Sequence, residues 1–389
     1  MSDEDDTAAA QEAVEDGLEG EGENEEVEQQ QQEEEGNEQR EEGEEGEGGE
    51  GEEKEKGEGE GDEIDPEVED PEEVEEDEHI PPKLLTQADI NEGISLLCKT
   101  GTGLSHAFVR LDIRDKELTD INLLSAFIHL RYIDMSVNSI KDISCLSGLT
   151  HLLTLKAEKN ILKSAALEEL PYLQQANFSD NRIKTTEGIY HPLLETLILS
   201  WNSIKEIAHL EPGRLTRLHT LELRSNALTS TKGLVIPTLK NLFLAQNKIK
   251  FLEDLEKLES LEMLHMRDNQ VDNLDGFSEK MRSLQYLNIR GNQLANKKEL
   301  NKLKVLPFLR AIVMAECPVS DEDDYRIEVL ITLRRIERLV KDVYTDEERQ
   351  EAEEIYEQRR LDEAAANEEG GGDEEGGEGA TTEATPAAE

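Results

Sequence analysis

The chain has 389 residues, enough for one large domain or two ordinary ones, and its formal net charge is −51. Charge of this sign argues against binding to nucleic-acid phosphate, and no apolar run approaches the about 20 residues that cross a bilayer. No apolar stretch opens the chain, so no signal peptide is predicted. Three widely separated cysteines (Cys98, Cys145 and Cys317) suit a reducing compartment. A cytoplasmic or nuclear protein is expected.

The negative charge is concentrated at the two ends. Residues 1–80 hold 40 acids and 3 bases, a net charge of −37, whereas residues 81–344 hold 35 of each sign. The N-terminal stretch is Glu, Gly and Gln with almost nothing apolar, so burial cannot offset its ordering entropy. We therefore predict disordered acidic tails over 1–80 and 366–389. They would serve for solubility and repulsion or, alternatively, as a tether for a basic partner.

An N-terminal cap is predicted over residues 84–107. Its first part, 84–101, has the spacing of an amphipathic helix, with Thr86 as the N-cap and Gly101 as the stop. Ile90, Ile94, Leu97 and Cys98 fall on one helical face, so Cys98 is interpreted as a core residue and not a redox thiol.

A nine-letter pattern, LxxLxLxxN, then repeats through the middle of the chain. "LRYIDMSVN" at 130–138 is the first full copy, and successive copies follow at steps of 21 to 24 residues. The ninth letters are Asn138, Asn160, Asn181, Asn202, Asn226, Asn247, Asn269 and Asn292. Degenerate copies at 108–116 and 309–317 carry Lys116 and Cys317 in that place, as expected where a stack ends.

The repeat predicts an α/β solenoid over 108–319 with about ten coils. The centre of each copy alternates like a strand, so the strands would form a parallel inner sheet, and short helices or 3₁₀ turns would lie outside. Each ninth-letter Asn follows a strand at a sharp turn. Its amide has two donors and an acceptor, so it can satisfy buried backbone groups of successive coils. We assign these eight residues a structural role.

The C-terminal end is predicted to be closed by a cap helix over 320–344, beginning near Ser320. Leu330, Ile336 and Leu339 lie on its apolar face. A second helix is predicted over 345–365, opened by a capping box of Thr345 and Glu348. Its apolar stripe is thin, so it could be a solvated extension or an arm that docks elsewhere.

No catalytic, phosphate-binding or metal-spaced motif occurs, so we expect no enzyme activity, cofactor, metal or small-molecule substrate. The open face of the strands is a better candidate, because it gathers aromatic, apolar and Arg residues of the kinds enriched at interface centres. The candidate partner-binding residues are Ile198, Trp201, Arg224, Phe243, Met263, His265, Arg267, Tyr286 and Arg290.

The register over 108–317, together with the caps, resembles the cytoplasmic 22-residue class of the leucine-rich-repeat superfamily. The segments "INEGISLLCKTGTGLSHAFVRLDIRDKELTDI" (90–121) and "LRYIDMSVNSIKDIS" (130–144) resemble a ciliary group of this class, scaffolds of the axonemal radial spoke. That resemblance implies a non-enzymatic role in assembling the head of a spoke, the third, in motile cilia and sperm tails. It also implies radial-spoke subunits as partners and a location in the cytoskeleton of the cilium.

Two other groups of the class remain as alternatives. The acidic leucine-rich nuclear proteins bind histones, but their acidic block follows the repeats, whereas here the longer block precedes them. The regulatory subunits of protein phosphatase 1 use a strand face of this type, although long tails and mixed charge on the face fit them less well.

Overall fold

The structure is a computed structural model that describes residues 80–101, 103–322 and 324–370. The predicted tails, 1–80 and 366–389, therefore lie outside the described residues, apart from Ile80 and residues 366–370. The prediction for 366–370 was wrong, because the helix expected to end at residue 365 continues to Gly370.

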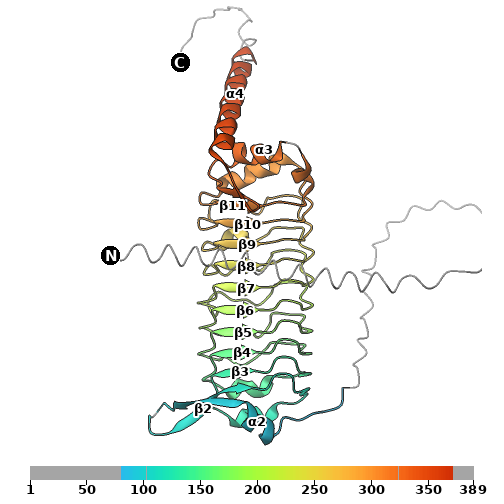
Figure 1. Cartoon of the computed structure of the whole chain (residues 1–389), viewed down its shortest axis with the longest axis vertical. Coiled ribbons are helices and arrows are strands. Elements are labelled where there is room, and N and C mark those ends of the chain that lie inside the picture. The colour runs from blue at the N-terminus through green and yellow to red at the C-terminus, as the bar shows by residue number, and fades with distance from the viewer. Residues whose placement is uncertain (1–79, 102, 323, 371–389) are drawn as a thin grey trace, which may run out of the picture. The chain divides into compact units, whose positions relative to one another are not determined.

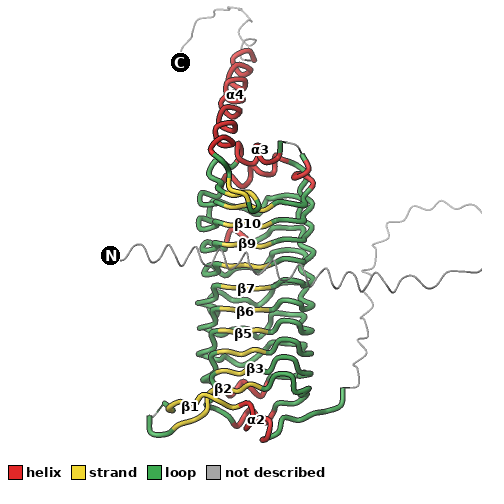
Figure 2. Tube along the Cα trace, in the orientation of Figure 1, coloured by secondary structure: helices red, strands yellow, loops and turns green. Residues whose placement is uncertain are grey.

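One parallel strand per coil forms the spine of the described region (Figures 1 and 2). Each strand pairs in register with the next, so that Leu197 lies beside Leu221 and Leu221 beside Leu242. The parallel strands are β2 (His106–Asp112), β3 (Tyr132–Asp134), β4 (Thr154–Lys156), β5 (Gln175–Asn177), β6 (Thr196–Ile198), β7 (Thr220–Glu222), β8 (Asn241–Phe243), β9 (Met263–His265), β10 (Tyr286–Asn288) and β11 (Ala311–Val313). The predicted leucine-rich-repeat solenoid with a parallel sheet is confirmed.

The first, fourth and sixth letters of the repeat fill one continuous core. In the coil of β7, Leu218, Leu221 and Leu223 are fully buried, and so is Leu228 in the following turn. The return segments opposite the sheet are turns and short 3₁₀ helices, as the spacing predicts. Within the described residues these are η1 (Asn122–Ala126), η2 (Ser144–Gly148), η3 (Leu255–Lys257), η4 (Lys297–Val305) and η5 (Pro318–Asp321).

The ninth-letter asparagines link each coil to the coil before it. Asn226 Oδ1 accepts a hydrogen bond from Ile204 N at 3.0 Å, and its Nδ2 donates to Leu199 O at 2.9 Å and Leu223 O at 3.1 Å. The other seven amides repeat this arrangement, each accepting from a backbone N–H of the preceding coil. The amide ladder therefore satisfies backbone groups that the strand ladder leaves unpaired at the turns.

The eighth letter, just before each amide, adopts a left-handed backbone in all ten coils. Its φ lies between 52° at Lys159 and 66° at Gly291, and the residue is glycine only at Gly291. This conformation turns the chain sharply enough for the following Asn to reach back to the previous coil. It costs about 1–2 kcal/mol for most side chains, a feature that the apolar pattern does not reveal.

Replacing Val137 with Asn should therefore stabilise the stack. Val137 is β-branched, has φ of 57° and is 43% exposed, so its strain is not offset by burial. Because Asn tolerates the left-handed region, we expect a gain of about 0.5–1 kcal/mol in the free energy of unfolding, measured by urea denaturation. Val137→Thr keeps the β-branch and should show no gain; an equal gain in both variants would contradict the strain argument.

The N-terminal cap differs from the helix predicted over 84–101. Thr86 does form the N-cap, with a reciprocal capping box to Asp89, but helix α2 spans only Gln87–Gly93. The chain then becomes strand β1 (Ile94–Lys99), which pairs antiparallel with β2. Consequently Leu97 is 57% exposed and Cys98 is half-buried, so placing both on a buried helical face was wrong.

Gly93 explains where α2 ends. A Cβ at this position would lie 1.9 Å from the carbonyl oxygen of Asp112, because the cap crosses β2 at backbone contact. Gly101, the predicted stop, has no atom within 4 Å of such a Cβ and lies beyond β1.

Gly93→Ala should open this cap. We expect a loss of about 2–3 kcal/mol, because backbone must move to admit the methyl group. Hydrogen exchange across β1 and β2 would report it as faster exchange confined to this end of the stack. Gly101→Ala is the matched control and should leave exchange unchanged; equal effects of the two variants would sink this explanation.

The C-terminal cap is likewise not a single helix over 320–344. Helix α3 spans Tyr325–Thr332, and the chain then forms strands β12 (Arg338–Leu339) and β13 (Asp342–Val343). β12 pairs parallel with β11, placing Leu339 beside Ile312. Both Leu339 and Ile336 are buried as predicted, but extended backbone continues the sheet where a longer helix would have left β11 as its edge.

Helix α4 (Asp346–Gly370) begins with the predicted Thr345–Glu348 capping box. Ala352 is buried, and Ile355 and Tyr356 pack against the core. Farther along, Leu361 is 58% exposed, and Figure 1 shows the later turns extending past the last coil. The first turns of α4 therefore dock on the C-terminal cap, and its later turns form the exposed extension.

The attachment of α4 should depend on pH through Glu348. The Arg326 guanidinium donates to this carboxylate at 2.5 Å and holds its pKa at about 2, below the ordinary 4.5. The stabilisation is therefore complete above pH 4.5 and is lost as the pH falls toward 2. The methyl NMR signal of Ala352 should shift over this window, with a smaller shift in Glu348→Gln; identical titrations would exclude this pair as the cause.

Candidate protein-binding surface

The strand face consists of the third-, fifth- and seventh-letter side chains of β2–β11, which point away from the core. Its first coils are polar and charged, with Asp112, Asp134 and Lys156 in the fifth column. From β6 onward the same column changes character, because Ile198 and Phe243 occupy it. The face therefore has an apolar zone over β6–β10, framed by polar coils.

An aromatic row lies at the centre of this zone. The rings of Phe243 and His265 stack with centroids 4.9 Å apart, and His265 lies 4.9 Å from Tyr286 on the next strand. Burial lowers the pKa of His265 to about 4, so its imidazole is neutral at pH 7. The row is thus an uncharged, preformed ring surface with little rotamer entropy left to lose on binding.

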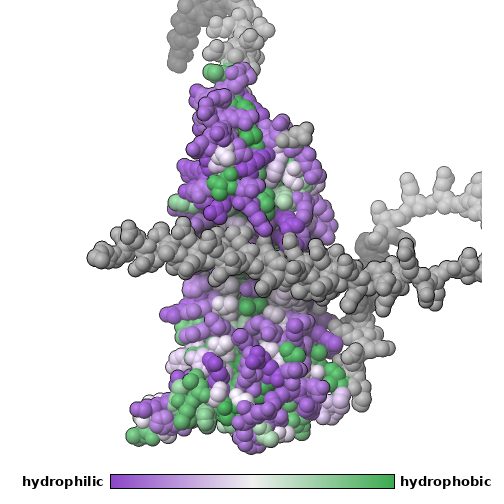
Figure 3. All heavy atoms as spheres, viewed as in Figure 1, coloured by the Kyte–Doolittle hydropathy of each residue, from purple (hydrophilic) through white to green (hydrophobic). Residues whose placement is uncertain are grey.

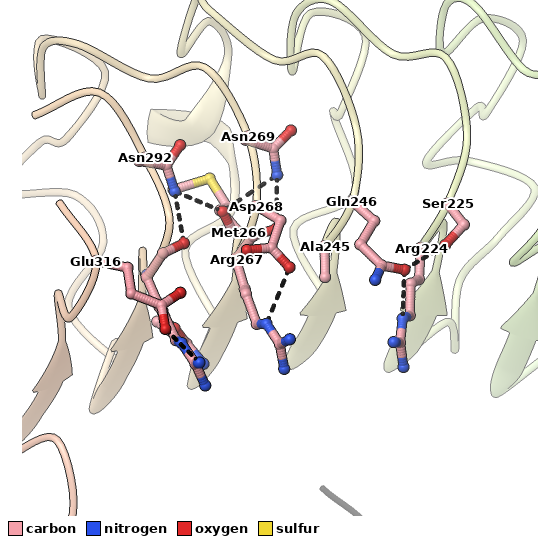
Figure 4. A network of polar contacts seen from close by, with 12 residues as sticks. Arg224, Ser225, Ala245, Gln246, Met266, Arg267, Asp268, Asn269, Asn292 and Glu316 are labelled. Carbon is pink, nitrogen blue, oxygen red and sulfur yellow. Dashed lines mark hydrogen bonds and ion pairs between the residues drawn. The ribbon is translucent and has the colours of Figure 1, made fainter. Parts of the chain in front are cut away.

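Arginines flank the aromatic row along the seventh column. Arg224 donates to Gln246 at 3.1 Å and lies over the Trp201 ring at 5.3 Å. Arg267 donates to its neighbour Asp268 at 3.0 Å. Figure 4 shows both guanidinium groups on the open side of the strands, whereas the amides of Asn269 and Asn292 lie among the turns. The arginines are therefore held in place by eighth-letter side chains of the same or the next coil.

Arg290 completes this column with an ion pair to Glu316 at 2.5 Å. Asp268 and Glu316 are eighth-letter residues, so the left-handed turns position the carboxylates that neutralise the arginines. This arrangement was not predicted, although both repeats have an acidic residue one place before the ninth letter.

Glu222 also belongs to this surface, although it is not among the predicted partner-binding residues. It lies between Ile198 and Phe243 in the fifth column, and burial raises the pKa of its carboxyl group while Arg224 opposes that rise. When a partner covers this apolar strip, it would have to donate a hydrogen bond to the half-buried Glu222, because burying a carboxylate without a donor is costly. It is the sole acid of that column between β5 and β11, which is the signal that could have identified it.

The structure places all nine predicted partner-binding residues on or beside one surface. Trp201 is 49% exposed at the rim, and the other eight are half-buried. Met263 and Tyr286 are cross-strand neighbours, which extends the aromatic row sideways. Asn288 and Val313 also belong to the fifth column but are buried, so the open zone narrows toward the C-terminal end.

In the part of the chain that the structure describes, no three or more His, Cys, Asp or Glu side chains gather where they could hold a metal ion. No described helix is long and apolar enough to cross a membrane.

A parallel sheet with one strand per coil, knitted by an amide ladder, defines a leucine-rich-repeat protein. Residues 237–368 match the leucine-rich repeat family model. The chain belongs to the family of leucine-rich repeat-containing protein 23. It is 53% identical to the human member over 274 residues, 70% of this chain and 80% of that one, and 52% identical to the Bos taurus member over 271 residues, 70% and 79%.

Among solved structures, an internalin from Listeria monocytogenes aligns with 63% of this chain and 92% of its own, at 18% identity and a TM-score of 0.35. The fold assignment rests instead on the repeats and on the family. Together these indicate a non-catalytic repeat protein whose role is protein–protein interaction.

Proposed function

We propose that this chain is a structural scaffold of the motile axoneme, where it helps assemble the radial-spoke head, that of the third spoke, and its links to neighbouring structures. It would act in the cytoskeleton of cilia and sperm flagella and support their motility, with radial-spoke subunits as protein partners. The family membership supports this proposal, together with the sequence resemblance to ciliary scaffolds.

The structural observation that carries the proposal is the aromatic row of Phe243, His265 and Tyr286. Its rings contact one another on adjacent strands, and Arg290 beside them is held by an ion pair to Glu316. Such a surface favours durable binding of another protein, because its side chains are already positioned before the partner arrives.

Localisation and extraction in a ciliated cell test this proposal. Tagged full-length chain should lie along the axoneme, remain in the detergent-insoluble pellet, and resist moderate salt. Loss of a nuclear, histone-bound pool at about 0.3–0.5 M salt would instead indicate a charge-driven histone contact. Recovery with a phosphatase catalytic chain would favour the regulatory-subunit alternative, and either result would overturn the axonemal proposal.

A further inference from the structure

The β1–β2 hairpin carries a second surface, separate from the aromatic row. The register pairs Leu97 with Phe108, Ser95 with Arg110, and Lys99 with His106. Because side chains alternate across a strand, these six lie on one side of the hairpin. All six are exposed, whereas Val109 and Leu111 on the other side are buried. We call these six residues the hairpin face.

Apolar area is left uncovered at the centre of the hairpin face. Leu97 is 57% exposed, its cross-strand neighbour Phe108 is 47% exposed, and Leu104 in the connecting turn is 91% exposed. Figure 3 shows apolar side chains gathered where the hairpin projects from the stack. An exposed cross-strand Leu–Phe pair contributes little to folding, so a clustered patch of this kind indicates a contact with another molecule.

Positive charge surrounds this apolar pair. Lys99 lies at one end, with the His106 side chain beside it, and Arg110 lies at the other; neither Lys99 nor Arg110 makes an ion pair with any described residue. Arg110 lies over the Tyr132 ring at 5.3 Å, which joins the hairpin face to the first coil of the strand face. Asp112, the nearest acid along β2, is already bound by Arg114 at 2.7 Å. The face therefore lacks the negative charge that would complement it.

The backbone of β1 determines how a partner can lie here. β1 is the outermost strand at this end of the described sheet, so its edge could in principle accept another strand. Leu96, however, has φ of 59° and breaks the extended edge at its middle. A partner that lies across the two strands avoids this obstacle. Two strands and their side chains span about 10 Å, close to the diameter of an α-helix.

We propose that the hairpin face docks an acidic amphipathic helix of another protein. Its apolar stripe would cover Leu97 and Phe108, and its carboxylates would reach Lys99, His106 and Arg110. This contact is independent of the aromatic row and of the axonemal assignment, and it gives the scaffold a second attachment point at its N-terminal end.

Photo-crosslinking in the native setting tests the proposal. Full-length chain carrying p-benzoylphenylalanine in place of Phe108 is expressed in cells that make the protein, irradiated, and the crosslinked peptide is sequenced. We expect one dominant partner peptide that is acidic and has leucine-like residues at helical spacing. Lys99→Glu combined with Arg110→Glu should reduce the yield at least tenfold, and the same photoreactive group in place of Phe251, 61% exposed away from the hairpin, should not capture it.

A synthetic peptide of the captured sequence then measures affinity directly. Its binding to the full chain should weaken at least tenfold for Leu97→Ser with Phe108→Ser, while the melting temperature stays unchanged because both residues are exposed. Capture of a basic or uncharged peptide would overturn the proposal. So would capture of a second copy of this chain, or a yield at position 108 no higher than at position 251.

Discussion

Asn226→Leu should lower the free energy of unfolding by about 2–4 kcal/mol, one of the larger single-residue effects expected in the stack. Leucine has a similar volume but leaves the buried Ile204 N–H without its acceptor. It also removes one of the two amide donors to each of the carbonyls of Leu199 and Leu223, which keep only the donors from Asn202 and Asn247. Each buried group left without a partner costs about 1–3 kcal/mol, and the lost contacts join two coils at once. Urea denaturation followed by circular dichroism measures the total.

Asn301→Leu provides the matched control for this loss. Asn301 is exposed on the outer side of the stack, and its Nδ2 donates only to Lys298 O within the same turn. The same chemical change should therefore alter stability by no more than about 0.5 kcal/mol. If Asn226→Leu were as mild as Asn301→Leu, the amide ladder would not hold the coils together.

Phe243→Ala combined with Tyr286→Ala should weaken binding of the partner at least tenfold and leave the fold intact. Both side chains project from the strand face and are half-buried, so truncation removes the row without opening the core beneath it. Central aromatic residues of an interface commonly account for 2 kcal/mol or more each, roughly a thirtyfold change in affinity. The loss of binding is measured by co-purification, as the fraction of each variant that remains in the native complex when all variants are expressed at the same level.

The control for this pair truncates two aromatic residues outside the strand face. Tyr172 is 49% exposed and Phe251 is 61% exposed, so their combined replacement by Ala removes comparable ring area. Partner retention should be unaffected. Binding that survives loss of Phe243 and Tyr286 but fails in the control would move the interface to the outer side of the stack.

The repeat predicted the stack of coils because every coil packs against the next in the same way. Asn181, Leu197 and Leu199 could be placed from their letters alone, since each position has the same environment in every coil. The two caps do not repeat, so their structure could not be predicted from the repeat. At Gly93 and Leu339 the outcome depends on how an end segment meets the last strand, through a backbone contact with Asp112 and a pairing with Ile312. Helical spacing of apolar residues could not reveal either contact.

The sequence predicted which residues lie on the strand face, but it did not predict how their charges are paired. Phe243 and His265 could be placed on the open face from their positions in the repeat, because side chains alternate between the two sides of a strand. Pairing of Arg267 with Asp268 depends on the left-handed turn, and the half-buried state of Glu222 depends on both neighbouring strands. These are properties of adjacent coils together, which a search within one repeat does not detect.

Hydroxyl-radical footprinting of the free full-length chain and of its native complex tests the central claim most directly. That claim is that the strand face over β6–β10 is where this scaffold holds its partner. Phe243, Met263 and Tyr286 should be oxidised in the free chain and protected several-fold in the complex, while Tyr172 and Phe251 react equally in both. Unchanged oxidation of the strand face, with protection confined to Tyr172 and Phe251, would contradict the account.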